Sequence, residues 1–168
     1  MTGIAREDFS KALLALLEET FQGPSGIYLD ADAGLFHTLD TVTAGAASLA
    51  PSAGARTIAA HCAHLAYYLR ANHDSMLERE QPLDWPSSWH PQHVGDQEWE
   101  DLKRRLRREY DALLDTVGGI ETWSAYRMGD AMAIVAHTAY HLGAIRHVLR
   151  NPSGPPFPDP QAPRREHP

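Results

Sequence analysis

The chain has 168 residues, of which 43% are hydrophobic, and it contains a single cysteine. A chain of this length buries about 70% of its unfolded surface on folding, so it needs neither a disulfide nor a metal merely to form a core. One cysteine excludes an internal disulfide, which suits a reducing compartment, and the formal net charge of −7 is unsuited to the phosphate backbone of nucleic acids.

Helical periodicity dominates the first third of the chain. Apolar residues at helical spacing predict a helix over 8–21, with Asp8 as its cap. The Gly-Pro-Ser-Gly sequence at 23–26 ends it. A weaker pattern over 32–46 predicts a shorter second helix, and 51–56 is predicted to be a loop.

The middle of the chain contains the strongest helical pattern and the longest connection. Residues 57–80 are predicted to form one long helix, for which Thr57 is a suitable cap. Residues 81–95 hold three prolines, two tryptophans and two histidines, which predicts a loop. This loop is long enough to have a function of its own rather than merely to connect two helices.

Two more long helices are predicted in the last part of the chain. The first covers 96–117 and ends at Gly118-Gly119, and the second covers 130–150. The tail at 151–168 is rich in proline and charge, so we expect a flexible arm. Strand-like alternation and internal repeats are both missing from the sequence. The predicted fold class is therefore all-α, with one antiparallel four-helix bundle over residues 1–150.

The first residues of the chain and the length of its apolar runs indicate the cellular compartment of the protein. The first residues lack the basic start and the continuous apolar stretch of a signal peptide. No apolar run approaches the ~18 residues that predict a membrane span. We therefore expect a cytoplasmic protein that has no membrane segment.

A basic run, Lys103 to Arg108, interrupts the acidic composition. Acidic residues are interleaved with it, as Glu100 lies four residues before Arg104 and Asp101 four before Arg105. Such spacing is typical of a solvated helix face that carries ion pairs. We favour this interpretation over a nucleic-acid-binding stripe and expect no nucleic-acid partner.

Histidine is unusually frequent, with ten in the chain, and two of them share one helix face. His137 and His141 are four residues apart, which leaves them only about 40° apart around the axis of the last helix. Both can therefore reach one cation. The alternative is two core histidines satisfied by hydrogen bonds, and the absence of a Glu after His137 excludes the HExxH metalloprotease motif.

A third ligand has to come from another part of the chain, because catalytic metal sites usually have three protein ligands. The helix predicted at 57–80 offers His61 and His64, and the loop after it offers His90 and His93. Helical periodicity alone slightly favours His61, which lies closer to the centre of the apolar stripe.

Two short segments resemble the signatures of a known family. In TIAAHCAHLAYYL, residues 57–69, a Thr at the helix start is followed seven residues later by His64 and then a Leu. In HTAYHLGAI, residues 137–145, two histidines four apart are followed by Gly143 and Ile145. With these segments, and with a Gly-Pro-Ser turn after its first helix, the chain resembles the DinB/YfiT-like four-helix proteins over nearly its whole length. It departs from their pattern at the residue after Gly143, where an Ala replaces the frequent Gln.

The resemblance implies a metal site and its surroundings. It implies zinc, nickel or a similar divalent ion on the ligands His64, His137 and His141. On that basis, His61, Tyr68 and Tyr140 are expected to surround the ligands or line the pocket. His90 and His93 are then ordinary histidines unless their loop folds over the metal, and Cys62 is inert core.

The resemblance also implies a class of chemistry. The family includes metal-dependent hydrolases and S-transferases that use a low-molecular-weight thiol, so we expect a divalent site that activates water or a thiol towards a small-molecule substrate. The alternative is a stress-response protein that binds a metal or ligand without turnover. The family commonly dimerises, which leads us to expect a homodimer.

Overall fold

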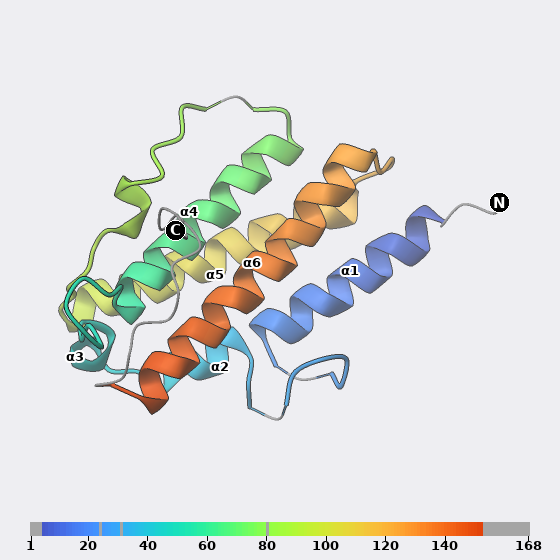
Figure 1. The fold of residues 1–168 in the computed structure, drawn as a ribbon. Helices are drawn as coiled ribbons and strands as arrows, with labels where there is room; N and C mark the ends of the chain where they lie inside the picture. Colours follow the sequence, from blue (N-terminus) through green and yellow to red (C-terminus); the bar gives the residue numbers. More distant parts are fainter. Residues whose placement is uncertain (1–4, 24, 31, 80, 153–168) are drawn as a thin grey trace, which may run out of the picture.

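The computed structural model describes residues 5–23, 25–30, 32–79 and 81–152. Every regular element in that part of the chain is helical, which confirms the predicted all-α class (Figure 1). In chain order the elements are α1 (Arg6–Phe21), α2 (Leu35–Asp40), α3 (Ala44–Ala47), α4 (Ile58–Met76), the 3-10 helix η1 (Ser87–Trp89), α5 (Asp96–Gly119) and α6 (Ala125–Arg150). The tail predicted at 151–168 lies outside the described residues from position 153 on.

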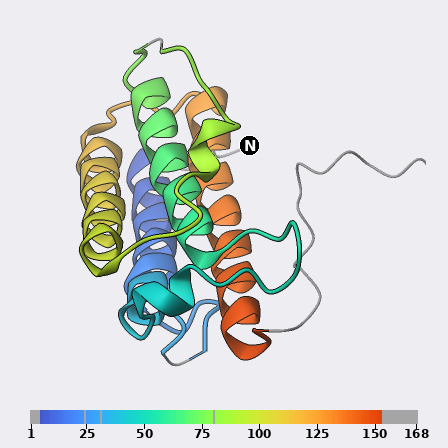
Figure 2. The same cartoon turned by 90° about the vertical axis from the view of Figure 1, so that its left-hand side faces the viewer.

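The four long helices enclose the core. The helix α4 packs against both α5 and α6, and α1 packs against the same two helices from the other side. Both ribbon views show these helices running side by side, with α2 and α3 at one end (Figures 1 and 2). The core side chains come from all of them, and the largest fully buried ones include Trp99, Tyr110, Phe21, Leu17, Leu65, Leu69 and Leu106.

Helix starts follow the capping residues only in part. The hydroxyls of Thr57 and Ser124 accept hydrogen bonds from backbone N–H groups three residues on, which confirms Thr57 as the cap of α4. The prediction that Asp8 caps the first helix is wrong. That helix begins at Arg6, after Ala5, so Asp8 lies in its first turn.

Glycine misled the prediction of two helix boundaries. The prediction that Gly118-Gly119 ends a helix at 117 is wrong, because α5 continues through both glycines to Gly119. The prediction that the last helix starts at 130 is wrong as well. Capped by Ser124, α6 starts at Ala125 and includes Gly129. The region predicted as one short helix at 32–46 contains two, α2 and α3.

A buried carboxylate shapes the loop after α1. Glu19 has no exposed surface, and its carboxylate accepts hydrogen bonds of 2.8–3.1 Å from the backbone N–H groups of Ile27, Tyr28 and Leu29. The Ser25 hydroxyl donates a further one of 3.2 Å. Burial acts to raise the pKa of Glu19, but these backbone and side-chain hydrogen bonds outweigh it and hold the pKa below its ordinary value.

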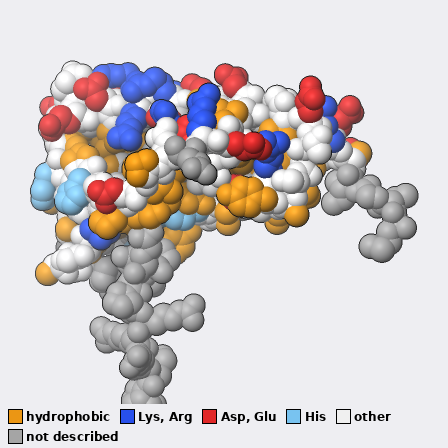
Figure 3. Space-filling model, turned by 90° about the horizontal axis from the view of Figure 1, so that it is seen from above, with side chains coloured by type: hydrophobic (Ala, Val, Ile, Leu, Met, Phe, Trp, Pro, Cys, Tyr) orange, Lys and Arg blue, Asp and Glu red, His pale blue; other side chains and the backbone are white. Residues whose placement is uncertain are grey.

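The charged face of α5 carries ion pairs of shorter spacing than predicted. Lys103 lies 2.8 Å from Glu100, and Arg104 pairs with Asp101, so these pairs join residues three apart rather than four. Arg107 lies over the ring of Phe36, with its guanidinium carbon 4.2 Å from the ring centroid. Figure 3 shows basic and acidic side chains interspersed on the face seen from above.

In the described part of the chain, no helix combines the length and the apolar character that a membrane crossing requires.

Candidate metal centre

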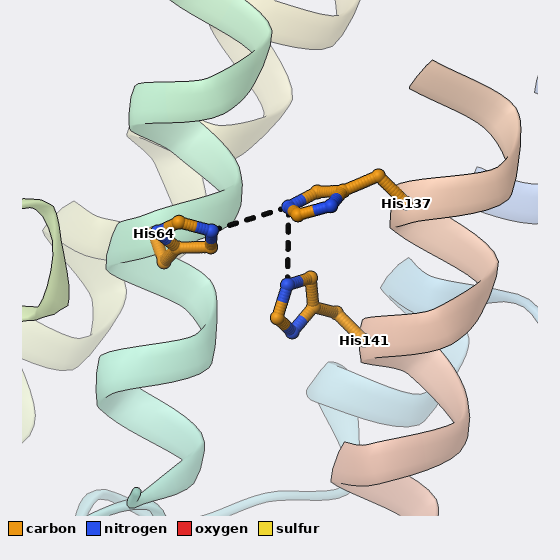
Figure 4. A group of neighbouring side chains, drawn as sticks. All are labelled: His64, His137 and His141. Atoms are coloured by element: carbon orange, nitrogen blue, oxygen red, sulfur yellow. Dashed lines mark hydrogen bonds between the residues drawn. The ribbon is translucent and has the colours of Figure 1, made fainter. Parts of the chain in front are cut away.

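Three imidazoles from two helices meet inside the protein. His64 comes from α4, and His137 and His141 come from successive turns of α6 (Figure 4). The Nε2 atom of His137 lies 3.1 Å from Nε2 of His64 and 3.1 Å from Nε2 of His141. One potential ligand atom from each ring lies within 4.8 Å of the others. The structure therefore brings together the three residues that the resemblance implies as ligands.

The spacing of the histidines on α6 directs two of the rings to α4. The four-residue interval places His137 and His141 one above the other on the face towards α4. On α4, His64 is fully buried and points towards these two rings.

The environment of the three rings keeps them neutral. His64 and His141 have no exposed surface, and His137 is half-buried. Burial, helped by the charges of neighbouring groups, lowers the pKa of His64 to about 3 and that of His141 to about 2. Burial alone lowers the pKa of His137 to about 4. Near pH 7 each imidazole therefore keeps a nitrogen lone pair, as a metal ligand requires.

Ser88 orients the ring of His64. Its Oγ lies 2.7 Å from Nδ1 of His64 and donates a hydrogen bond of 2.6 Å to the carbonyl oxygen of Trp85. Because the Ser88 proton is used there, Oγ accepts from His64, whose Nδ1 must carry the proton. The Nε2 lone pair of His64 then faces the other two histidines. Hydrogen bonds of this kind orient the ligands of known metal sites.

His61 contacts Nδ1 of His141, as Ser88 contacts Nδ1 of His64. The two Nδ1 atoms lie 2.9 Å apart, so one ring donates a hydrogen bond to the other. His61 is nearly buried, at 7% exposed, and does not belong to the group of three. The structure thus places His61 next to a candidate ligand, whereas helical periodicity had slightly favoured it as the ligand itself.

Aromatic rings hold the imidazoles from the sides. Trp89 lies parallel to His64, with centroids 4.0 Å apart and an interplanar angle of 5°. Tyr68 stacks on His137 at 3.9 Å, and Tyr140 meets His141 edge-on at 5.2 Å. Such stacking restricts ring rotation and so favours one arrangement of the nitrogen atoms.

Hydrogen bonds alone explain this arrangement poorly. With the proton of His64 on Nδ1, its Nε2 offers only a lone pair to His137. A proton on Nε2 of His137 can point along only one of the two 3.1 Å contacts that this atom makes. A cation between the rings accepts a lone pair from all three, which satisfies every nitrogen at once.

The distances also suit a metal. Zinc–nitrogen bonds are about 2.0–2.1 Å, so two nitrogens at a tetrahedral angle lie about 3.3 Å apart. The observed separations of 3.1 Å are close to this value. The donor set of three imidazoles suits zinc, nickel and copper better than magnesium or calcium, which prefer oxygen ligands.

The other described histidines and the cysteine lie outside this group. His90 and His93 are exposed, so the loop contributes Ser88 and Trp89 to the centre instead of a ligand. The role of Ser88 was missed by the sequence analysis, which noted only that its loop was long enough to be functional. Cys62 is fully buried, and burial raises the pKa of its thiol, which fits the expected inert core residue.

Comparison with known proteins does not assign the chain to a family. No protein-family model, no curated protein and no solved structure matches it. The functional argument therefore rests on the geometry of the three histidines and their neighbours.

Proposed function

We propose that the chain is a metal-dependent enzyme of the DinB/YfiT-like kind, with one zinc or nickel ion bound by His64, His137 and His141. The observation that supports this most directly is that Nε2 of His137 lies 3.1 Å from Nε2 of both His64 and His141, with one ligand atom of each ring within 4.8 Å of the others. On the rings of His64 and His141, hydrogen bonds engage the opposite nitrogen, Nδ1. Three protein ligands leave a coordination position open, which is typical of catalytic rather than structural sites.

The chemistry of such a centre is that of a Lewis acid, which makes bound water or a thiol acidic enough to act as a nucleophile near neutral pH. The protein's contribution is to hold neutral imidazoles in one orientation and to limit the access of water. Because His137 is the half-buried member of the group, we propose that a small molecule approaches the metal from its side. We therefore propose a hydrolase or a low-molecular-weight-thiol S-transferase that acts on a small-molecule substrate.

A role in binding without turnover is the second candidate. The full burial of His64 and His141, together with the packing of Trp89 on His64, favours it because a closed centre restricts substrates. On either function, we propose that the long helices form the antiparallel four-helix bundle of this family and that the protein works in the cytoplasm as a homodimer. Light scattering of the purified protein tests the dimer.

Metal content tests the proposal. Untagged protein should contain about one equivalent of zinc or nickel per chain by elemental analysis, and His137→Ala should contain almost none. His73→Ala, on the same helix as His64 but outside the group, is the matched control and should keep the metal. Equal metal content in both variants would contradict the proposed ligands.

Turnover separates the two candidate functions. Metal-loaded protein is incubated with a panel of small electrophiles, with and without a low-molecular-weight thiol, and products are identified by mass spectrometry. Metal-dependent hydrolysis or thiol adducts that His137→Ala does not form would support the enzyme. A loaded protein that converts none of them would favour the binding role.

A further inference from the structure

Among the described residues, no carboxylate contacts the three histidines directly, and Asp130 acts only on the phenol of Tyr68, which stacks on His137. The proposed ligands are imidazoles, which bind a metal ion in their neutral form and so leave its charge uncompensated. The side chains that contact them in the described part of the chain are imidazoles, phenols, an indole and a hydroxyl: His61, Tyr68, Tyr140, Trp85, Trp89 and Ser88. No Asp or Glu of the described residues belongs to the group that can hold the ion.

A positive charge lies one ring away. Arg56, just before the cap of α4, is half-buried, and its guanidinium carbon lies 4.8 Å from the centroid of the Trp89 ring. That ring is parallel to His64 at 4.0 Å.

Among the described residues, no carboxylate forms an ion pair with Arg56. The ion pairs among the described residues involve other cations, such as Arg70 and Arg79 with Asp74 and Arg127 with Glu78. A half-buried guanidinium that packs on an aromatic ring keeps N–H donors for an outside acceptor. Because this guanidinium lies beside the proposed metal centre, its positive charge favours an anion as the bound molecule.

We propose that the centre takes its substrate as a small singly charged anion such as a carboxylate, and that Arg56 contributes to its attraction. This inference rests on the proposed function, because the divalent ion supplies most of the positive charge. The metal ion and the guanidinium of Arg56 are two positive charges in a largely buried site whose ligands are neutral. Because water screens charges weakly there, both interact strongly with an anion. A neutral or cationic substrate gains nothing from this field.

Azide binding to the cobalt-loaded protein tests the proposal, since cobalt(II) gives visible absorption bands that change when an anion coordinates. Azide should change the wild-type spectrum with a saturable titration. Replacement of Arg56 by Gln should raise the azide dissociation constant about fivefold or more, and Arg56→Lys should stay within about twofold of wild type. Arg104→Gln, an equal change in net charge on the exposed face of α5, is the control and should match wild type.

The outcomes separate this inference from the proposed function. A protein that binds no cobalt would overturn both. Cobalt bound with normal bands, but no response to azide, would overturn the anion proposal alone. If Arg56→Gln and Arg104→Gln bound azide with equal affinity, Arg56 would make no contribution to anion binding. The dissociation constant of cobalt, measured on each variant, shows whether the substitution has disturbed the ligands instead.

Discussion

Two buried polar groups of this protein, Glu19 and the three histidines, satisfy their hydrogen-bonding needs in opposite ways. The carboxylate of Glu19 accepts from three backbone N–H groups and one hydroxyl of the loop that follows α1. Its charge is balanced by donors of the same chain segment. Nothing outside the protein is needed.

The histidine group is not completed by the chain. Ser88 and His61 engage the outer nitrogens, but the inner Nε2 atoms of His64, His137 and His141 face one another. The difference shows how to separate a buried polar group that serves stability from one that serves binding. The first has its partners in the chain, whereas the second leaves aligned lone pairs for a guest. The predictions below test this distinction.

The largest expected difference is in the response to metal. A ligand at 100 times its dissociation constant stabilises the native state by about 2.7 kcal/mol, which raises the melting temperature of a protein of this size by about 5–10 °C. Wild-type protein should show this rise with zinc, and His141→Ala should show none. Glu19→Gln should start from a lower melting temperature and still show the full rise. Differential scanning calorimetry of the metal-free and the zinc-loaded form of each protein measures the starting melting temperature and its rise.

Removal of the Ser88 hydroxyl should weaken metal binding without abolishing it. Ser88→Ala leaves Nδ1 of His64 without its acceptor, so the affinity for zinc should fall about 10–100-fold in a competition titration with a chelator. Ser88→Thr, which restores a hydroxyl, should recover most of the loss. The neighbouring Ser87 bonds to Asp84 instead, so Ser87→Ala is the matched control. An affinity in Ser88→Ala equal to that of Ser87→Ala would show that the hydrogen bond does not orient the ligand.

Acid should destabilise the metal-free protein in a range that the histidines define. The pKa of His64 falls from 6.5 to about 3 and that of His137 to about 4. Between about pH 6.5 and 4, the unfolded chain therefore binds more protons than the native state, and stability falls as the pH falls. His137→Ala should show a shallower decline of melting temperature over this range. Glu19 contributes in the same direction only below its ordinary pKa of 4.5. Identical slopes for both proteins would argue against neutral buried ligands.

Neutralisation of Glu19 should have the smallest effect on the centre. Glu19→Gln loses charge-assisted hydrogen bonds from the loop, so the melting temperature should fall by several degrees. Zinc affinity should stay within about twofold of wild type, because the described neighbours of the three histidines come from α4, α6 and the segment before α5 rather than from the loop after α1. Asp30→Asn, an exposed acid of the same loop, is the control for charge. A large loss of metal affinity would mean that the two regions are coupled.

Much of the architecture was readable from periodicity, and the failures have local causes. The patterns at 57–80 and 96–117 correspond to α4 and α5 because their apolar stripes are continuous. The start of α6 was missed because Gly129 interrupts its first two turns, although Ser124 is a good cap. Gly118-Gly119 remains helical at the end of α5, because propensity is a weak guide where packing and length favour one more turn.

The site was predictable to the extent that it lies on helices. The spacing of His137 and His141 placed both rings on one face, and the resemblance implied His64 as the third member. Spacing could not choose between His61 and His64, because both are buried on α4 and only the position of α6 separates them. Ser88 was beyond reach, since no periodic pattern predicts the path of a loop in space.

The segment between α4 and α5 runs back along the helix that it follows. The backbone N–H of Asp84 donates to the hydroxyl of Tyr67, Ser88 contacts His64, and the hydroxyl of Thr57 donates to the backbone carbonyl of Gln92. These contacts descend α4 in order, so the segment forms a strap over that side of the histidines. The strap thus covers His64 on that side, and Ser88 and Trp89 are the residues that it places against the ring.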